Sequence, residues 1–155
     1  MMIGLLIFVL VIFGAEFLIK KKVDESIEEG EEREVLKGKL VLTKHYNTGF
    51  VMNALKNMPS LVKAIHFAVA FLFLCCYTLI VREKGSKVRK VGSAMVMGGG
   101  LSNLFDRVTK GHVVDYIRIP FKKLKPLSKI IFNISDVCIL VGSILMLLGK
   151  GKRKE

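Results

Sequence analysis

The stretch VMGGGLSNLFDRVTKGHVVDY, residues 96–116, changes from apolar and glycine-rich to charged within a few residues. Its first part belongs to an apolar run at residues 91–105, and its second part carries Asp106, Arg107 and Asp115. Charged side chains are costly at membrane depth, so they normally face the interior of a helix bundle and carry function. The stretch therefore predicts the end of a membrane span that leads directly into a polar site.

Three other apolar runs lie at residues 1–15, 61–81 and 130–149, and charged segments separate them. A helix needs about 20 apolar residues to cross a bilayer, and the first and third runs of the chain reach that length only with their polar ends. Tilt, or burial of those ends against neighbouring helices, would remove the mismatch. The pattern predicts a mostly α-helical membrane protein with four transmembrane helices.

We predict that residues 1–155 form a single integral membrane domain. The N-terminal run has an alternative interpretation as a cleaved signal peptide, but it lacks a basic region in front and a small-residue cleavage site before the lysines. The expected spans are about 1–19, 61–81, 88–106 and 130–149, and the expected outer-surface segments are 20–60 and 107–129.

The outer-surface segments differ in composition. Residues 20–39 alternate blocks of charge, which is typical of a solvated helix or loop. Residues 40–51 are rich in β-branched and aromatic side chains, which favours a short β element on the membrane surface. The segment at 107–129 has Gly111 at an expected turn and is interpreted as a connector.

The formal net charge of +12 at pH 7 would suggest nucleic-acid binding in a soluble protein. Here the basic residues flank the apolar runs, where they meet water and anionic headgroups. We therefore expect membrane lipids as partners, no nucleic acid, and a monomer. The loops on both sides are basic, so charge counting alone does not fix the orientation. We favour both termini in the cytoplasm.

Several polar residues at the span ends need a physical reason. Residues three apart share a helix face, as Asn133 and Asp136 do. Asp106 can be neutralised locally by Arg107 and so be only a structural anchor. The residues in question are Glu16, Asn103, Asp106, Arg107, Asp115, Asn133 and Asp136.

Asp115 and Asp136 have no obvious cationic partner in the sequence. Two carboxylates in a poorly hydrated site cannot both ionise easily, and one keeps a proton. Such a pair can activate water against a peptide carbonyl and protonate the leaving amine. The alternative is that both are isolated helix-end aspartates that reach water. Sequence order does not show whether they touch.

The three cysteines and the glycine run have simpler interpretations. Cys75, Cys76 and Cys138 lie within apolar runs and are expected to pack as small apolar residues. They lack the spacing and neighbouring histidines of a metal site, so we expect no metal and no other cofactor. The glycines at 98–100 are expected to permit close helix packing.

Three blocks carry a resemblance to a known family. They are NTGF (47–50), GGGLSNLFDRVTKGHVVDY (98–116) and FNISD (132–136), in that order among the apolar runs. Together they resemble lipoprotein signal peptidase, the bacterial aspartyl membrane enzyme also called signal peptidase II. The resemblance implies an aspartic endopeptidase that cuts lipid-modified prolipoproteins on the amino side of the diacylglyceryl-cysteine and thereby releases the signal peptide.

Carried over position by position, the resemblance implies that Asp115 and Asp136 are the catalytic dyad. It also implies the bacterial cytoplasmic membrane as location, with cytoplasmic termini and the site at the outer surface. The acidic residue late in the first span has a lysine four positions on, as in the family. The substrate-binding residues would be Asn47, Gly49, Asn103, Arg107, Asn133 and Glu16.

The sequence departs from the family at several of these places. Glu16 stands where an aspartate is usual, Ser102 where a glycine is usual, and Phe50 and Val51 where small residues are expected. These changes bear on substrate range and turnover more than on reaction type. Two other functions are alternatives: a small transporter or proton-coupled protein, because intramembrane carboxylates relay protons, and a non-catalytic membrane interaction protein.

Overall fold

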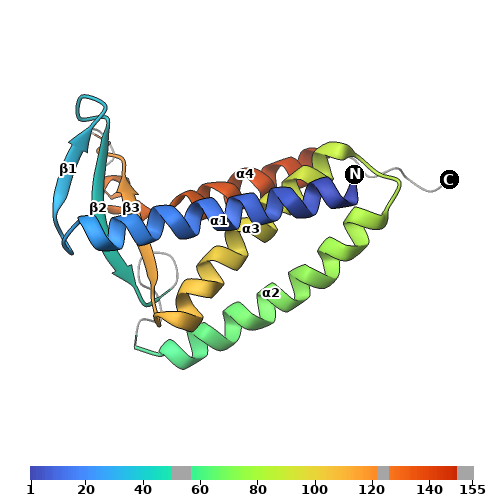
Figure 1. The fold of residues 1–155 in the computed structure, drawn as a ribbon, viewed down its shortest axis with the longest axis horizontal. Coiled ribbons are helices and arrows are strands. Elements are labelled where there is room, and N and C mark those ends of the chain that lie inside the picture. The colour runs from blue at the N-terminus through green and yellow to red at the C-terminus, as the bar shows by residue number, and fades with distance from the viewer. Residues whose placement is uncertain (50–56, 122–125, 150–155) are drawn as a thin grey trace.

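The computed structural model describes residues 1–49, 57–121 and 126–149. Figure 1 shows an elongated helix bundle with a small sheet at one end, and with the start of α1 and the end of α4 at the other. This arrangement confirms a mostly helical fold with a small β element. The helices are α1 (Met2–Ser26), α2 (Pro59–Arg82), α3 (Lys87–Thr109) and α4 (Ile134–Leu148), with a 3₁₀ turn, η2 (Leu127–Lys129). The strands are β1 (Glu32–Val35), β2 (Leu40–Asn47), β3 (Val113–Arg118) and β4 (Ile131–Phe132).

Helix α3 lies at the centre of the bundle and packs against each of the other three helices. A Cβ added to Gly99 would lie 2.6 Å from the carbonyl oxygen of Ser135 in α4, and one added to Gly98 would lie 2.9 Å from Ile12 in α1. Glycine thus lets the backbones approach closely. The predicted packing role is confirmed for these two residues, whereas a Cβ at Gly100 would meet no described atom within 4 Å.

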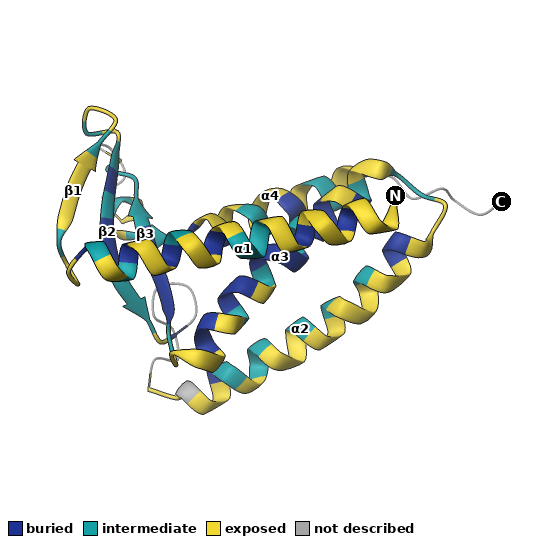
Figure 2. Cartoon of the chain, viewed as in Figure 1, coloured by how far each residue is buried: buried dark blue, intermediate teal, exposed yellow. Residues whose placement is uncertain are grey.

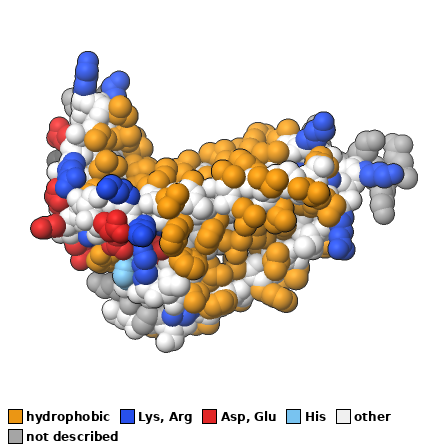
Figure 3. Space-filling model, viewed as in Figure 1, with side chains coloured by type: hydrophobic (Ala, Val, Ile, Leu, Met, Phe, Trp, Pro, Cys, Tyr) orange, Lys and Arg blue, Asp and Glu red, His pale blue; other side chains and the backbone are white. Residues whose placement is uncertain are grey.

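Helices α1 and α2 are apolar and exposed at the same time. Among the described residues, these are the two helices long and apolar enough to cross a membrane, and only 17% and 11% of their apolar windows are buried. A helix that is apolar all round and not covered by protein is typical of a membrane span. Figure 2 shows the exposed residues along both helices, and Figure 3 shows apolar side chains covering the bundle between its charged ends.

The sheet is antiparallel with the order β1-β2-β3-β4. The end of α1 packs on it, because Val23 and Ile27 form a buried cluster with Val114 and Tyr116 of β3. The helix continues past the expected span at 1–19 to Ser26, since its last turns bury an apolar face against the sheet.

The expected β element is confirmed by β2, but the sequence interpretation missed the other three strands. The connector interpretation of residues 107–129 is wrong for Val113–Arg118, which forms β3 between β2 and β4. Gly111 has φ 82°, so the turn expected there is confirmed. Helix α4 begins at Ile134 and not at residue 130, because Ile131–Phe132 pairs with β3.

Candidate active site

The start of α4 is fixed by a pair of reciprocal hydrogen bonds. The side-chain oxygen of Asn133 accepts from the backbone N–H of Asp136 at 3.0 Å, and a carboxylate oxygen of Asp136 accepts from the backbone N–H of Asn133 at 3.1 Å. This capping box satisfies amide groups that a helix start leaves without partners. Asp136 is therefore the third residue of α4.

Asp115 comes to the same place from β3. The side-chain amide of Asn133 donates to one Asp115 oxygen at 2.7 Å, and that of Asn47 donates to the other at 3.0 Å. Asn47 is the last residue of β2, which pairs with β3 in antiparallel register. Asn133 thus bonds to Asp115 through its nitrogen and to Asp136 through its oxygen. The two aspartates are joined through one buried asparagine.

The second oxygen of Asp136 is held from α3. Asn103 donates its side-chain N–H to this oxygen at 2.8 Å, and its own amide oxygen accepts from the ammonium group of Lys20 at 2.8 Å. Lys20 also donates to the hydroxyl of Ser102 at 3.1 Å. Ser102 therefore supplies one partner of a buried lysine.

Lys20 is the charged centre of this end of the bundle, with 1% of its surface exposed. Its nitrogen lies 3.0 Å from Asp106 and 3.7 Å from Glu16. Asp106 also accepts from the backbone N–H of Val114 and lies 3.6 Å from Lys110. The expected local neutralisation of Asp106 by the next residue is therefore wrong, because Lys20 of α1 and Lys110, the residue after α3, pair with it instead.

Arg107 contacts the end of β2 and the residues after it. Its guanidinium group donates to the carbonyl oxygens of Asn47, at 3.4 Å, and Gly49. The backbone N–H of Gly49 donates back to the side-chain oxygen of Asn47 at 3.0 Å, and these bonds fix the amide that reaches Asp115. Phe50 and Val51, which stand where the resemblance predicts small residues, lie outside the described residues.

Glu16, which the resemblance placed among the substrate-binding residues, is buried in the structure to 1% exposure. One of its oxygens accepts from the hydroxyl of Tyr116 in β3. The other accepts from Ser135 in α4 twice, from the backbone N–H at 3.1 Å and from the hydroxyl at 2.7 Å. Glu16 therefore ties the strand of Asp115 to the helix start of Asp136. Tyr116 directly follows Asp115 in the sequence, and Ser135 directly precedes Asp136.

The electrostatics of Asp115 follow from its surroundings. Burial raises its pKa to about 7, and the nearby charge of Asp136 acts in the same direction, while the hydrogen bonds from Asn47 and Asn133 oppose the rise. Burial and the bond to Glu16 also raise the pKa of Tyr116, which keeps its hydroxyl a donor. One carboxyl of the pair can therefore hold a proton near neutral pH.

The described residues offer nothing that resembles a metal centre. No group of three or more His, Cys, Asp or Glu side chains among them is arranged to hold an ion. Cys75, Cys76 and Cys138 are unpaired in this part of the chain, and the first two are exposed on α2. The carboxylates of the site and the amides that hold them suit acid–base chemistry on a carbonyl.

Residues 7–150 of the chain match the family model described as signal peptidase (SPase) II. The chain belongs to the signal peptidase II family. The lipoprotein signal peptidase of Ectopseudomonas mendocina is 30% identical over 138 residues, which cover 84% of this chain and 80% of that protein. That of Bacillus subtilis is 29% identical over 150 residues and covers 94% of each. Family membership supports signal-peptide cleavage from prolipoproteins and implies a peptidase.

The fold agrees with this assignment. A solved bacterial membrane enzyme structure matches this signal peptidase II family member with a TM-score of 0.80, over 94% of this chain and 85% of that chain. The sequence identity is 22%, so this likeness concerns the fold.

Sequence reasoning left three residues of the site out of its list. Lys20 was noted only for its spacing from Glu16. Residues four apart share a helix face, so this spacing could have predicted that the lysine lies beside the glutamate. The aromatic residue after Asp115, Tyr116, was part of the quoted motif. Ser135 gave no signal, because its bonds to Glu16 depend on a contact between distant segments of the chain.

Proposed function

We propose that this protein is an endopeptidase that hydrolyses the peptide bond on the amino side of a lipid-modified cysteine in prolipoproteins, with Asp115 and Asp136 as the catalytic pair. The observation that carries the proposal is that the side chain of Asn133 forms hydrogen bonds to both aspartates. Its N–H donates to a carboxylate oxygen of Asp115 at 2.7 Å, and its oxygen accepts from the backbone N–H of Asp136 at 3.0 Å. Isolated helix-end aspartates that merely reach water would not need this arrangement.

Each aspartate has a separate role in the first half of the reaction. Asp136, ionised, takes a proton from water while the water oxygen forms a bond to the carbonyl carbon. Asp115, whose pKa burial raises to about 7, donates its proton to the carbonyl oxygen. The product is a neutral tetrahedral diol, and the proton has changed sides within the pair.

The second half reverses the roles. Asp136, now protonated, donates to the amide nitrogen as the carbon–nitrogen bond breaks. Asp115, now ionised, takes a proton from one hydroxyl of the diol, whose carbon–oxygen double bond re-forms. The products are a carboxylic acid and an amine, and the pair returns to its starting state. Neither metal nor cofactor enters these steps.

We place all four helices across the bacterial cytoplasmic membrane, with the sheet at the outer surface and both termini in the cytoplasm. The exposed apolar faces of α1 and α2 support this placement. The polar face of α3 is covered by α1 and α4, as its buried Asn103 and Asp106 indicate. We expect lipids and the lipidated substrate as partners, no nucleic acid, and a monomer.

Substrate contact is proposed for Arg107. Its Nε is buried and has no hydrogen-bond partner among the described residues. The same side chain lines a cavity of about 360 Å³ that includes Lys63 and Phe67 of α2. A peptide carbonyl in this cavity would accept from the free N–H. Lipid chains anchored in the bilayer would hold the scissile bond at a fixed depth, which turns a rare encounter into a positioned one.

The acidic residues favour this function over a proton-coupled transporter. A relay needs carboxylates spaced through the membrane. The buried acidic side chains of the described residues, Glu16, Asp106 and Asp115, gather at the sheet end.

The test is direct. Purified protein in detergent is incubated with a synthetic lipidated prolipoprotein peptide and, as control, with the same peptide lacking the lipid. We expect cleavage on the amino side of the modified cysteine and much slower cleavage of the control. A lipidated peptide that stays intact at every pH would overturn the proposal.

A further inference from the structure

The end of the bundle opposite the sheet holds a second buried lysine. Lys90, in the first turn of α3, is only 4% exposed. Its ammonium group donates to the carbonyl oxygen of Val81, at the end of α2, at 2.8 Å. An ammonium group carries three donors. No ion pair among the described residues includes Lys90, so its charge is opposed there only by a carbonyl dipole.

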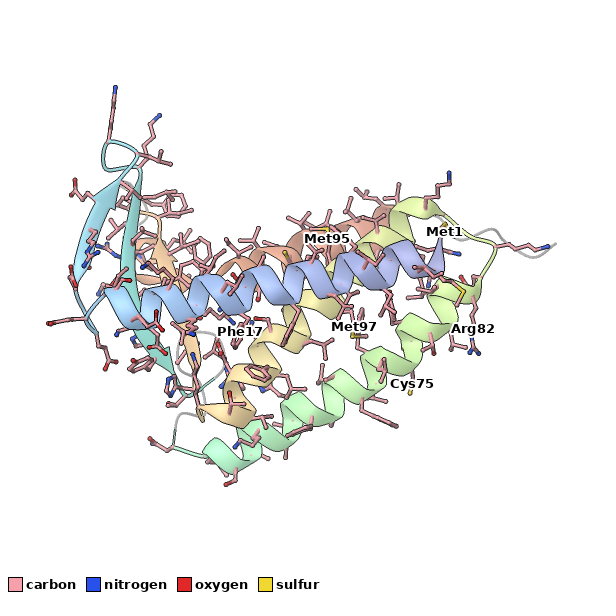
Figure 4. All side chains as sticks on the ribbon, in the orientation of Figure 1. Met1, Phe17, Cys75, Arg82, Met95 and Met97 are labelled. Carbon is pink, nitrogen blue, oxygen red and sulfur yellow. The ribbon has the colours of Figure 1, made fainter. Side chains whose placement is uncertain are left out.

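Lys90 lines a cavity of about 620 Å³. One side of this cavity is apolar, because Met2 and Ile3 of α1 face it. Figure 4 shows Met1 and Arg82 together at this end, far from the sheet. At a rise of 1.5 Å per residue, Met2 lies roughly 20 Å along α1 from Glu16. The cavity is therefore separate from the candidate active site.

The charges around the cavity are unbalanced. Arg82, Lys84, Lys87 and Lys90 line it, against one acidic residue, Glu83. Glu83 lies 3.4 Å from Arg89, which reduces its effect on the other basic groups. A buried cation is stable only when an opposite charge or good hydrogen bonds replace its water. The cavity thus combines an uncompensated positive charge with an apolar wall.

We propose that this cavity binds one anionic phospholipid, with the headgroup phosphate on Lys90 and the acyl chains on the apolar surface of α1 and α2. Basic pockets between membrane helices are suited to such headgroups. A phosphate oxygen would accept the remaining donors of Lys90, and Arg82 and Lys87 would add charge at the rim. The exposed apolar residues Leu6 and Leu79 provide surface for the chains. The inference uses the membrane placement proposed above but not peptide cleavage.

The experiment measures lipid binding to the purified full chain by native mass spectrometry, with phosphatidylglycerol and phosphatidylcholine of identical chains. We expect phosphatidylglycerol to bind more tightly. Lys90→Met should weaken phosphatidylglycerol binding about tenfold, or about 1.4 kcal/mol, and weaken phosphatidylcholine binding less, because that headgroup has no net charge. Lys90→Arg should retain most of the affinity. Lys84→Met is the matched control, because Lys84 is exposed at the rim, and it should cause a smaller loss.

Equal binding of the two lipids, or an unchanged phosphatidylglycerol affinity in Lys90→Met, would overturn the proposal. Displacement of the lipid by millimolar inorganic phosphate would also overturn it, since the site would then bind simple anions. If Lys90→Met does not fold, the double variant Arg82→Gln, Lys87→Gln takes its place with the same expected loss. Cleavage of the lipidated peptide is measured separately, and Lys90→Met should retain it.

Discussion

The two ends of the bundle each bury a lysine, but they treat its charge differently. Lys20, at the sheet end, lies 3.0 Å from Asp106 and 3.7 Å from Glu16 and donates to Asn103 at 2.8 Å. Lys90, at the other end, has one backbone carbonyl as its partner among the described residues. The first charge is compensated within the protein and linked to Asp136 through Asn103. The second faces a cavity.

The comparison distinguishes a buried charge that the protein itself neutralises from one that an anionic ligand could neutralise. At the sheet end, lysine, carboxylates and amides from α1, α3, α4, β2 and β3 satisfy one another. Such networks are rigid when every member is paired, and removal of one member leaves the others unpaired. At the opposite end the protein supplies only one sign of charge. The predictions below separate these two situations.

Among the variants that test this comparison, Lys20→Met is expected to reduce peptide cleavage most. The change leaves Asp106 and Glu16 buried without their cation, and loss of one partner of a buried pair costs roughly 3–5 kcal/mol. We expect cleavage of the lipidated peptide to fall at least about a hundredfold, or about 2.7 kcal/mol. Lys21→Met is the control, because Lys21 is the next residue and is exposed. Equal cleavage rates in the two variants would contradict the role given to Lys20.

A smaller effect is expected at Glu16, for which we propose a positioning role because it bonds to Tyr116 and Ser135, the neighbours of the two aspartates. Glu16→Gln presents an amide to the donors of Tyr116 and Ser135, and we expect kcat to fall more than tenfold, or about 1.4 kcal/mol, with little change in KM. Glu16→Asp keeps the charge and should retain turnover within about tenfold. Initial rates over a range of peptide concentrations separate kcat from KM.

The control for Glu16 lies on the same helix. Glu25→Gln alters an exposed carboxylate of α1 whose partner is Lys21 at 3.9 Å, and it should leave both constants unchanged. A rise in KM at constant kcat in Glu16→Gln would assign Glu16 to substrate binding and not to positioning. A loss in Glu16→Asp as deep as that in a dyad variant would contradict the positioning role.

The pH dependence of the cleavage rate should reflect the ionisation of Asp115 and Asp136. Because the pKa of Asp115 is raised to about 7, the proton needed on this carboxyl is present below that pH and is lost as pH rises through it. We expect the rate to fall on the alkaline side near neutrality. Asn47→Ala removes a hydrogen bond that lowers this pKa, so the alkaline fall should move to higher pH. An alkaline fall that stays in place in this variant would contradict the assignment of Asp115.

The smallest effect is expected from chelation. The proposed steps move protons between two carboxyl groups, water and the substrate, without a metal ion. EDTA should leave the cleavage rate unchanged. Loss of activity with EDTA, and recovery with one added divalent ion, would contradict the proposed steps.

The sequence predicted the helical fold better than the contacts between distant segments of the chain. Apolar runs located the helices because exclusion from water acts on local composition. They did not predict that the first helix continues to Ser26, where its last turns pack on a sheet built from distant segments. Strand β3 was missed for the same reason.

The candidate site shows a similar limit. Asp115 and Asp136 were selected from spacing and resemblance, but their link through Asn133 requires β3 to end up beside the start of α4. The three-residue spacing of Asn133 and Asp136 was interpreted as a shared helix face, whereas it forms a capping box. The prediction that Arg107 neutralises Asp106 was wrong, because Lys20 reaches Asp106 from another helix.

The most direct test of the central claim is the rate of the aspartate variants. Asp115→Asn, Asp136→Asn and the double variant are purified beside the wild type and assayed on the lipidated peptide at matched concentrations. Residues that act as a unit lose most of their contribution with the first change. We predict that each single variant loses nearly all cleavage and that the double variant is about as slow as either. Substantial activity in one single variant, or losses that multiply as independent factors, would contradict a catalytic pair.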